Sequence, residues 1–354
     1  MPRPDLNEYV CAAHVHSTHS DGTGTVRQIA RAARRAGVDV VLLTDHDTLT
    51  ARESGEERHY GDVLVLVGEE VSPEGGNHYL AFGNRGVIDH DGLSPAAICE
   101  AVAADGGFGF AAHPFSRGSE RFKRARPMPW GDLESEQLQG IELWSFVNDN
   151  GERIGSLRDA ARFLRRPGAF VDLAPRSNLE QWDEMCRTRR VAALGGIDAH
   201  QIGLRMLGVV PLRLMSYRRS FSHLRTHVLC EQRLNGDLDH DRAQVFDALR
   251  EGRSFLAMDS FQRADGFDFW AEHGRSTALT MGSDGPAAPG WELQVRLPRS
   301  ARLRLVHAGE TIVETDGTGL HHHAEAPGAY RVEVLLGQGE RQRTWILSNP
   351  IYLR

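Results

Sequence analysis

Nearly every short apolar segment in the first two thirds of the chain carries a histidine, aspartate or glutamate at its end. The strands that we predict there cover residues 9–16, 40–46, 63–71, 78–83, 108–114, 141–145 and 191–200. Segments with helical spacing separate them, at 25–37, 95–107, 156–166 and 178–190. Such alternation indicates an α/β sheet or barrel, whose active site lies at the carboxyl ends of the strands. We therefore expect the polar side chains to gather at that edge.

The pattern changes after a last predicted helix at 242–252. Alternating strands follow, separated by glycine, proline and aspartate turns, and we see no helical spacing among them. This indicates a C-terminal antiparallel β-sandwich. We predict two domains, a β/α barrel over 1–253 and the sandwich over 254–354. We expect Phe267, Phe269 and Trp270 to belong to the sandwich core. A role as one wall of a substrate site is the second interpretation.

Composition narrows the classes of function. The 354 residues carry a formal net charge of -7 and no block of like charge, which argues against a nucleic-acid partner or binding to an anionic membrane. We find neither a long apolar span nor the apolar run of a signal peptide, and the four cysteines form no CxxC pair. We expect a cytoplasmic protein with reduced thiols. The sequence leaves its oligomeric state open.

The first candidate site is HVHSTHSDG, at the end of the first predicted strand. His14 and His16 are two residues apart, so both project from one face of a strand and can bind one metal ion. Asp21 follows in a glycine-containing turn and can reach over the same edge. His19 is a candidate for a hydrogen bond or a contact to the substrate.

Two further motifs end the next strands. In TDHDT, we expect His46 to coordinate metal and either Asp45 or Asp47 to orient its ring. In GEEV, Glu69 and Glu70 point to opposite faces, and the strand pattern alone does not choose between them.

The remaining candidate ligands come later in the chain. They are His78 at the start of a strand, His113 in AAHP, and Asp198 and His200 in GGIDAH. Imidazole and carboxylate ligands without a thiolate suit Mn, Fe or Zn. Nine candidates exceed the needs of one ion, so we expect two or three divalent ions with a bridging carboxylate.

These motifs occur in order between residues 9 and 201, and together they resemble the polymerase and histidinol phosphatase (PHP) superfamily. The resemblance implies a distorted seven-stranded β/α barrel with Glu70 as the bridging ligand. It also implies three ligand groups, namely His14, His16, Glu70 and Asp198; Glu70, His78 and His113; and Asp21, His46 and His200. Within the superfamily, the whole chain looks most similar to the branch that contains carbaryl-type metallohydrolases.

Three functions are consistent with this pattern. The first is a phosphoesterase that uses a metal-bridging hydroxide on a small-molecule ester. Arg117 and Arg205 are then candidate phosphate clamps, and His19 is a candidate proton donor to the leaving group. The second is hydrolysis of a carbamate or carboxylic ester at the same metals. The third is a non-enzymatic ligand-binding protein.

Two other features receive a plainer interpretation. An amidohydrolase barrel also begins with HxH, but its frequent carboxylated lysine has no good candidate here, since Lys123 is the only lysine. The HHH run at 321–323 lies in a strand-and-turn region where neighbouring imidazoles alternate faces. We expect that run to be exposed surface and not a metal site.

Overall fold

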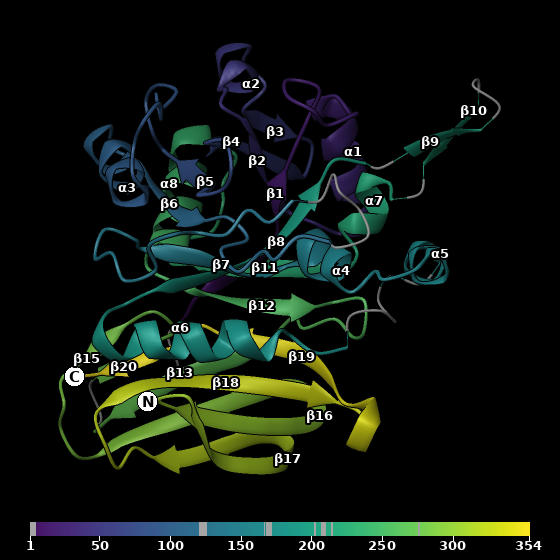
Figure 1. The fold of residues 1–354 in the computed structure, drawn as a ribbon. Helices are drawn as coiled ribbons and strands as arrows, with labels where there is room; N and C mark the ends of the chain where they lie inside the picture. Colours follow the sequence, from purple (N-terminus) through teal and green to yellow (C-terminus); the bar gives the residue numbers. More distant parts are fainter. Residues whose placement is uncertain are drawn as a thin grey trace. The chain divides into compact units, whose positions relative to one another are not determined.

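The computed structural model describes residues 5–119, 126–165, 167, 172–201, 203–206, 210–213, 215–274 and 277–354 (Figure 1). The chain divides into two compact units. We call residues 9–171 and 194–226 the barrel unit, and residues 1–8, 172–193 and 227–354 the sandwich unit.

The barrel unit is built on seven strands that pair in the order β8, β1, β2, β4, β5, β6, β7 within a closed sheet. Their bounds are β1 (Asn7–Val15), β2 (Val40–His46), β4 (Val63–Val71), β5 (Tyr79–Phe82), β6 (Phe108–Ala111), β7 (Gly140–Ser145) and β8 (Ala192–Ala199). Strand β3 (Arg58–Tyr60) adds to the outside of β4. The predicted seven-stranded barrel is confirmed.

One strand of this barrel runs against its neighbours. The pairs β1–β2, β2–β4, β1–β8 and β6–β7 are parallel, whereas β5 is antiparallel to both β4 and β6. The first residue of β5 therefore lies at the edge where β4 and β6 end. This reversal brings His78, which directly precedes β5, to the same edge as the carboxyl ends of the other strands.

Helices and a hairpin complete the barrel unit. They are α1 (Val26–Ala36), α2 (Thr50–Glu53), α3 (Pro95–Ala104), α4 (Phe146–Glu152), α5 (Leu157–Arg165), α7 (Tyr217–Ser220) and the hairpin of β9 (Gly203–Met206) and β10 (Val210–Arg213). Helix α1 begins at a reciprocal capping box between Thr25 and Gln28, and it ends at Gly37 in the left-handed conformation. Its apolar face, which includes Ile29 and Ala33, is buried in a core shared with β1, β2 and β4.

The sandwich unit is mainly antiparallel. Its elements are α6 (Arg176–Thr188), the end of β11 (Leu224–Cys230), α8 (Leu238–Arg250), β12 (Ser254–Met258), β13 (Asp268–His273), β14 (Thr277–Thr280), β15 (Asp284–Gly285), β16 (Trp291–His307), β17 (Glu310–His323), β18 (Gly328–Leu336), η2 (Gly339–Arg341), β19 (Arg343–Ser348) and β20 (Ile351–Leu353). Most pairs are antiparallel, and the short β15–β20 pair is parallel. The predicted C-terminal antiparallel sandwich is confirmed.

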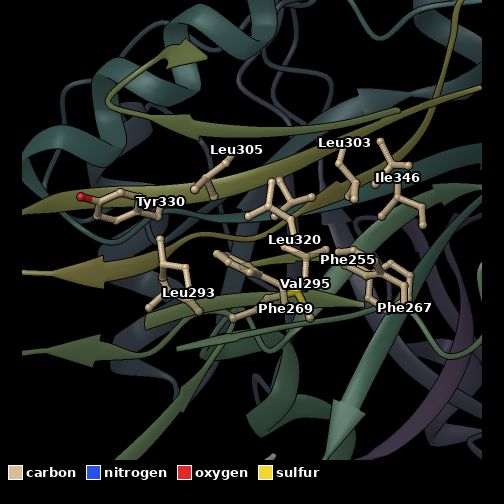
Figure 2. Close-up of a cluster of buried hydrophobic side chains, with 14 of the residues drawn as sticks. Phe255, Phe267, Phe269, Leu293, Val295, Leu303, Leu305, Leu320, Tyr330 and Ile346 are labelled. Carbon is tan, nitrogen blue, oxygen red and sulfur yellow. The ribbon is translucent and has the colours of Figure 1, made fainter. Parts of the chain in front are cut away.

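Alternating side chains of these strands form one apolar core (Figure 2). Phe267 and Phe269 are buried within it, whereas Trp270 is half-buried. The sandwich unit includes residues 172–193 and 227–253 in addition to the predicted 254–354. The boundary that we placed between residues 253 and 254 stays a prediction. Among the described residues, no helix is both long and apolar enough to cross a membrane.

A buried ion pair joins α6 to β18 inside the sandwich unit. The Arg331 guanidinium donates to both oxygens of Asp183, at 2.6 and 2.7 Å, and to Glu333 at 2.8 Å. The Arg331 side chain is only 2% exposed. Because the two carboxylates are also buried, loss of the guanidinium leaves their negative charges without compensation.

We predict that Arg331→Met lowers the free energy of unfolding by about 3–5 kcal/mol, as expected when one partner of a buried ion pair is removed. Denaturant titration followed by circular dichroism measures the change. Arg302→Met is the matched control, because Arg302 bonds Asp316 on the more exposed part of the same sheet. Arg302→Met should lower the free energy of unfolding by less than about 1 kcal/mol. Equal small losses in both variants would contradict the prediction.

Candidate metal centre

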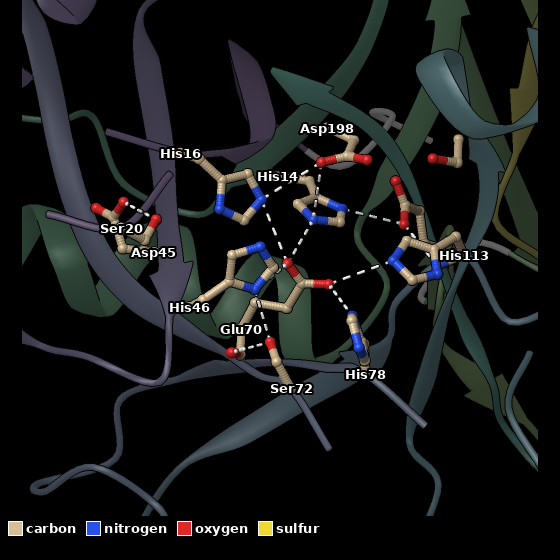
Figure 3. A network of polar contacts seen from close by, with 12 residues as sticks. His14, His16, Ser20, Asp45, His46, Glu70, Ser72, His78, His113 and Asp198 are labelled. Atoms are coloured by element: carbon tan, nitrogen blue, oxygen red, sulfur yellow. Dashed lines mark hydrogen bonds and ion pairs between the residues drawn. The ribbon is translucent and has the colours of Figure 1, made fainter. Parts of the chain in front are cut away.

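The Glu70 carboxylate lies at the centre of a cluster of histidines in the barrel unit (Figure 3). Its Oε2 lies 3.1 Å from His14 Nε2, 3.3 Å from His16 Nε2 and 3.3 Å from His46 Nδ1. Glu70 itself is 1% exposed. This oxygen therefore faces residues from the ends of β1 and β2.

The second oxygen of Glu70 faces a different group. Oε1 lies 2.9 Å from His78 Nδ1 and 3.3 Å from His113 Nε2. His78 precedes the reversed strand β5, and His113 follows β6. A carboxylate whose two oxygens face separate sets of imidazoles has the geometry of a bridging ligand.

Asp198, at the end of β8, joins the first group. Its Oδ1 lies 3.5 Å from His14 Nε2 and 3.4 Å from His16 Nε2. Asn148 Nδ2 donates to the other carboxylate oxygen at 3.0 Å, which holds the Asp198 side chain in place. The structure thus brings His14, His16, Glu70 and Asp198 together as one set of donors.

A third group lies toward the rim of the site. Asp21 Oδ1 is 3.0 Å from His200 Nε2, 3.7 Å from His46 Nε2 and 3.9 Å from His16 Nδ1. The rings of His16 and His200 stack with centroids 4.1 Å apart. Asp21 is 59% exposed, so this group is more open to solvent than the other two. All nine candidate ligands therefore lie in one site.

The donors fit divalent metal ions. His16 is fully buried, and neither of its ring nitrogens makes a well-aligned hydrogen bond, although Nε2 lies 3.3 Å from Glu70 Oε2 and 3.4 Å from Asp198 Oδ1. A buried polar atom without a partner is costly unless something else binds it. The histidine nitrogens lie 2.9–3.3 Å from the Glu70 carboxylate oxygens. This is close to the distance of about 3.3 Å between two ligand atoms of a tetrahedral zinc ion. The residues can therefore hold divalent metal ions, as the sequence predicts.

Neighbouring groups determine which ring nitrogen of His14 and His113 can bind a metal ion. His14 Nδ1 lies 3.2 Å from Glu142 Oε2, and His113 Nδ1 lies 3.4 Å from the carbonyl of Met128. Because these oxygens only accept hydrogen bonds, each Nδ1 donates to its partner. Nε2, which lies beside Glu70 in both rings, is then the nitrogen that can bind an ion once it carries no proton.

His46 is fixed in the same way by Ser72. The Ser72 hydroxyl donates to the backbone carbonyl of Glu70, and it lies 2.7 Å from His46 Nδ1. Since that hydroxyl proton is already used, His46 Nδ1 donates to Ser72 Oγ and Nε2 is left to bind a cation. His46 Nε2 faces Asp21, which assigns His46 to the third group.

The role expected for Asp45 or Asp47 is therefore corrected. Among the described contacts, neither carboxylate reaches the His46 ring. Asp45 accepts hydrogen bonds from Ser17 N and Oγ, both at 2.7 Å, and from Ser20 Oγ at 2.6 Å. Asp47 accepts from Ser72 N at 2.8 Å. Asp45 shapes the loop between His16 and Asp21, because it accepts hydrogen bonds from two serines of that loop.

Adjacent glutamates on β4 have different surroundings. The Glu69 carboxylate accepts hydrogen bonds from Asn84 at 2.7 Å and from the Ile88 N–H at 3.0 Å, away from the histidines. Burial raises the pKa of Glu69 to about 7. Burial opposes ionisation of Glu70 as well, but the charge of His14 and the hydrogen bonds from neighbouring histidines hold its pKa well below the usual range.

Three of the candidate ligands adopt a backbone conformation that strands rarely contain. The φ angles of His14, His113 and Asp198 are 60°, 31° and 54°, in the left-handed region. The register between β1 and β2 shifts at His14, since Ala13 pairs with Leu42 and Val15 with Leu43. Left-handed non-glycine residues cost about 1–3 kcal/mol each and gather at functional sites. The bulge turns His14 toward the cluster, where simple strand alternation had predicted regular geometry.

Glu142 on β7 is a residue of the site that our sequence analysis did not identify. It is 1% exposed, its Oε2 lies beside His14 Nδ1, and the same oxygen accepts from the His113 N–H at 2.7 Å. One carboxylate thus orients two of the candidate metal ligands. The signal was present in the sequence, because a glutamate in the middle of the apolar strand IELWS needs a buried partner.

The other predicted site residues lie outside the cluster of donors. His19 Nε2 is 2.6 Å from Glu56 Oε2. Arg117 is exposed, and its backbone N–H donates to the Glu152 carboxylate. Arg205 belongs to β9, and its side chain lies outside the described residues, as does all of Lys123.

Comparisons with known proteins give partial matches. No known family model matches the chain. An uncharacterized protein of Methanocaldococcus jannaschii is 29% identical over 116 residues, covering 29% of this chain and 66% of that protein. A phosphoribosyl 1,2-cyclic phosphate 1,2-diphosphodiesterase of Eggerthella lenta is 38% identical over 95 residues, covering 24% of this chain and 34% of that enzyme. The matches therefore span part of each relative.

One solved structure covers almost the whole chain. It is a two-domain protein from Bacteroides vulgatus that contains a predicted PHP-like metal-dependent phosphoesterase. The match covers 99% of this chain and 97% of that one, with 15% sequence identity and a TM-score of 0.46.

We predict that Glu142→Gln lowers the metal affinity of the barrel unit by roughly 10–100-fold, the usual effect of losing a carboxylate that orients a ligand. Metal retained after dialysis against graded chelator, measured by elemental analysis, tests this. Glu69→Gln is the control, since a glutamine oxygen can still accept from Asn84 and Ile88. Unchanged retention in Glu142→Gln would contradict the assigned role.

Proposed function

We propose that this chain is a metal-dependent phosphoesterase that acts on a small-molecule ester with two or three divalent ions, Mn, Fe or Zn. The observation that carries the proposal is the position of Glu70, whose two oxygens face separate groups of imidazoles. Ions held there would supply Lewis acidity and a hydroxide at neutral pH. The partial match to a diphosphodiesterase supports phosphorus as the atom attacked.

The chain's own residues then divide the work. The first group is His14, His16, Glu70 and Asp198, and the second is Glu70, His78 and His113. The open third group of Asp21, His46 and His200 faces solvent on the side of Asp21, where a phosphate can approach. Glu142 holds His14 and His113 in place, and Asp45 is a positioning residue for the loop that carries Asp21.

We assign proton transfer to the leaving group to His19. Glu56 fixes the ring through Nε2, so Nδ1 is the nitrogen that can exchange a proton. Arg117 and Arg205 are the proposed clamps for the phosphate oxygens, because a guanidinium pairs bidentately with such oxygens. A carbamate or carboxylic ester is the alternative substrate, favoured by the resemblance of the whole chain to the carbaryl-hydrolase branch.

Turnover of model esters tests the proposal. We expect the protein loaded with Mn²⁺, Zn²⁺ or Fe²⁺ to hydrolyse an aryl phosphate or a bis-aryl phosphate. His78→Ala should lower kcat/KM by about 10³-fold, or about 4 kcal/mol of transition-state stabilisation, because it removes a ligand of the second group. Glu69→Gln should keep the activity, since Glu69 faces away from the cluster.

Other outcomes separate the alternatives. Turnover of an aryl methylcarbamate alone would overturn the choice of phosphorus and retain a metal-dependent hydrolase. A metal-equilibrated preparation without bound transition metal would overturn the enzyme assignment and favour a ligand-binding protein.

A further inference from the structure

A histidine-rich stretch of the sandwich unit lies at the end of β17. In the pairing of β16 with β17, Glu292 lies opposite His323, Leu293 opposite His322, and Gln294 opposite His321. Side chains alternate between the two faces of a strand, and directly paired residues share a face. His321, His323 and Glu292 therefore project from one face, and His322 projects from the other. The expectation that this run is no metal site took account of neighbouring residues only, and the register of β16 adds Glu292 from the next strand.

The three side chains are near enough to bind one ion. His321 Nε2 lies 3.3 Å from Glu292 Oε2, and His323 Nδ1 lies 3.7 Å from Glu292 Oε1. One donor atom from each of the three residues lies within 4.8 Å of the others. The side chains are 42–70% exposed, so an ion has direct access from solvent. Donors around a tetrahedral zinc ion are about 3.3 Å apart, so these exposed side chains must move closer together to bind one.

The charges nearby favour a cation. Glu272 on β13 is paired directly opposite Glu292 on β16. Like charges in this position destabilise a sheet. Among the described contacts, Glu272 accepts from the Trp270 indole at 2.7 Å, and Glu292 pairs with His321 and His323, with no arginine at either carboxylate. A divalent ion would offset both negative charges.

We propose that Glu292, His321 and His323 form a divalent metal site, formed by residues distinct from those of the barrel cluster, with Zn²⁺ as its ion. Two imidazoles and one carboxylate suit Zn²⁺, Ni²⁺ and Cu²⁺, with water in the remaining position. Among the described strand pairs, β17 pairs with β16 alone, so it is an edge strand. The ion joins the end of this edge strand to its neighbour and thereby stabilises the sandwich unit.

Metal stoichiometry of the full-length protein tests the site. We expect wild type to hold one more Zn²⁺ equivalent than the double variant His321→Ala/His323→Ala, after both are equilibrated with excess Zn²⁺ and passed over a desalting column. His322→Ala is the matched control, because it removes an imidazole from the same strand but from the opposite face. It should bind like wild type.

Cu²⁺ titration gives a second measurement. Trp270 lies opposite Gln294, which lies opposite His321, so the indole and the proposed ion share one face across neighbouring strands. Bound Cu²⁺ should quench Trp270 fluorescence in wild type and in His322→Ala. This quenching should be lost in the double variant. In Glu292→Gln, the Cu²⁺ concentration that gives half of the quenching should rise by roughly tenfold or more, because loss of a carboxylate that only orients a ligand already weakens metal binding by that much.

Clear results would overturn the proposal. Equal Zn²⁺ stoichiometry in wild type and the double variant would overturn it. An equal loss of bound Zn²⁺ in the double variant and in His322→Ala would also overturn it. Circular dichroism checks that each variant is folded. If the double variant fails to fold, Glu292→Gln, which keeps the side-chain shape, decides through its Cu²⁺ titration.

Discussion

The buried Glu70 carboxylate is the group on which the barrel unit depends. A buried charge is unfavourable unless it is paired, and Glu70 is surrounded by imidazoles from the ends of β1, β2, β6 and the start of β5. Those imidazoles can reach it only because the sheet closes and β5 is reversed. The topology and the site therefore impose the same requirement, which is that several strand ends meet at one carboxylate.

A bound cation would offset the strain in this site. His14, His113 and Asp198 hold unfavourable backbone angles, and the buried His16 ring makes no well-aligned hydrogen bond. Each feature alone reduces stability. Their concentration around one glutamate indicates a structure arranged for a ligand that offsets these costs together. Glu142 adds to this arrangement, since it holds the His14 ring through Nδ1 before any ion binds.

Much of the barrel could be predicted from the sequence because strand ends are local signals. The apolar runs and the residues that follow them mark where β1, β2, β4 and β8 present their candidate ligands. The partners of those ligands are not local. Glu142 is 128 positions from His14, and the Ser72 hydroxyl that fixes His46 is 26 positions away. Strand periodicity gives no information about such pairs, and it also does not reveal the left-handed residue that turns His14.

The chain contains the same local motif in two different environments. His14 and His16, like His321 and His323, are histidines two residues apart near the end of a strand. The first pair is fully buried beside Glu70, whereas the second is exposed beside Glu292. Burial removes competing water and strengthens electrostatic attraction to an ion, and it also fixes the rings in advance. Exposed rings must lose rotamer freedom when they bind. Spacing alone therefore marks where an ion can bind, and the surroundings determine how tightly it is held.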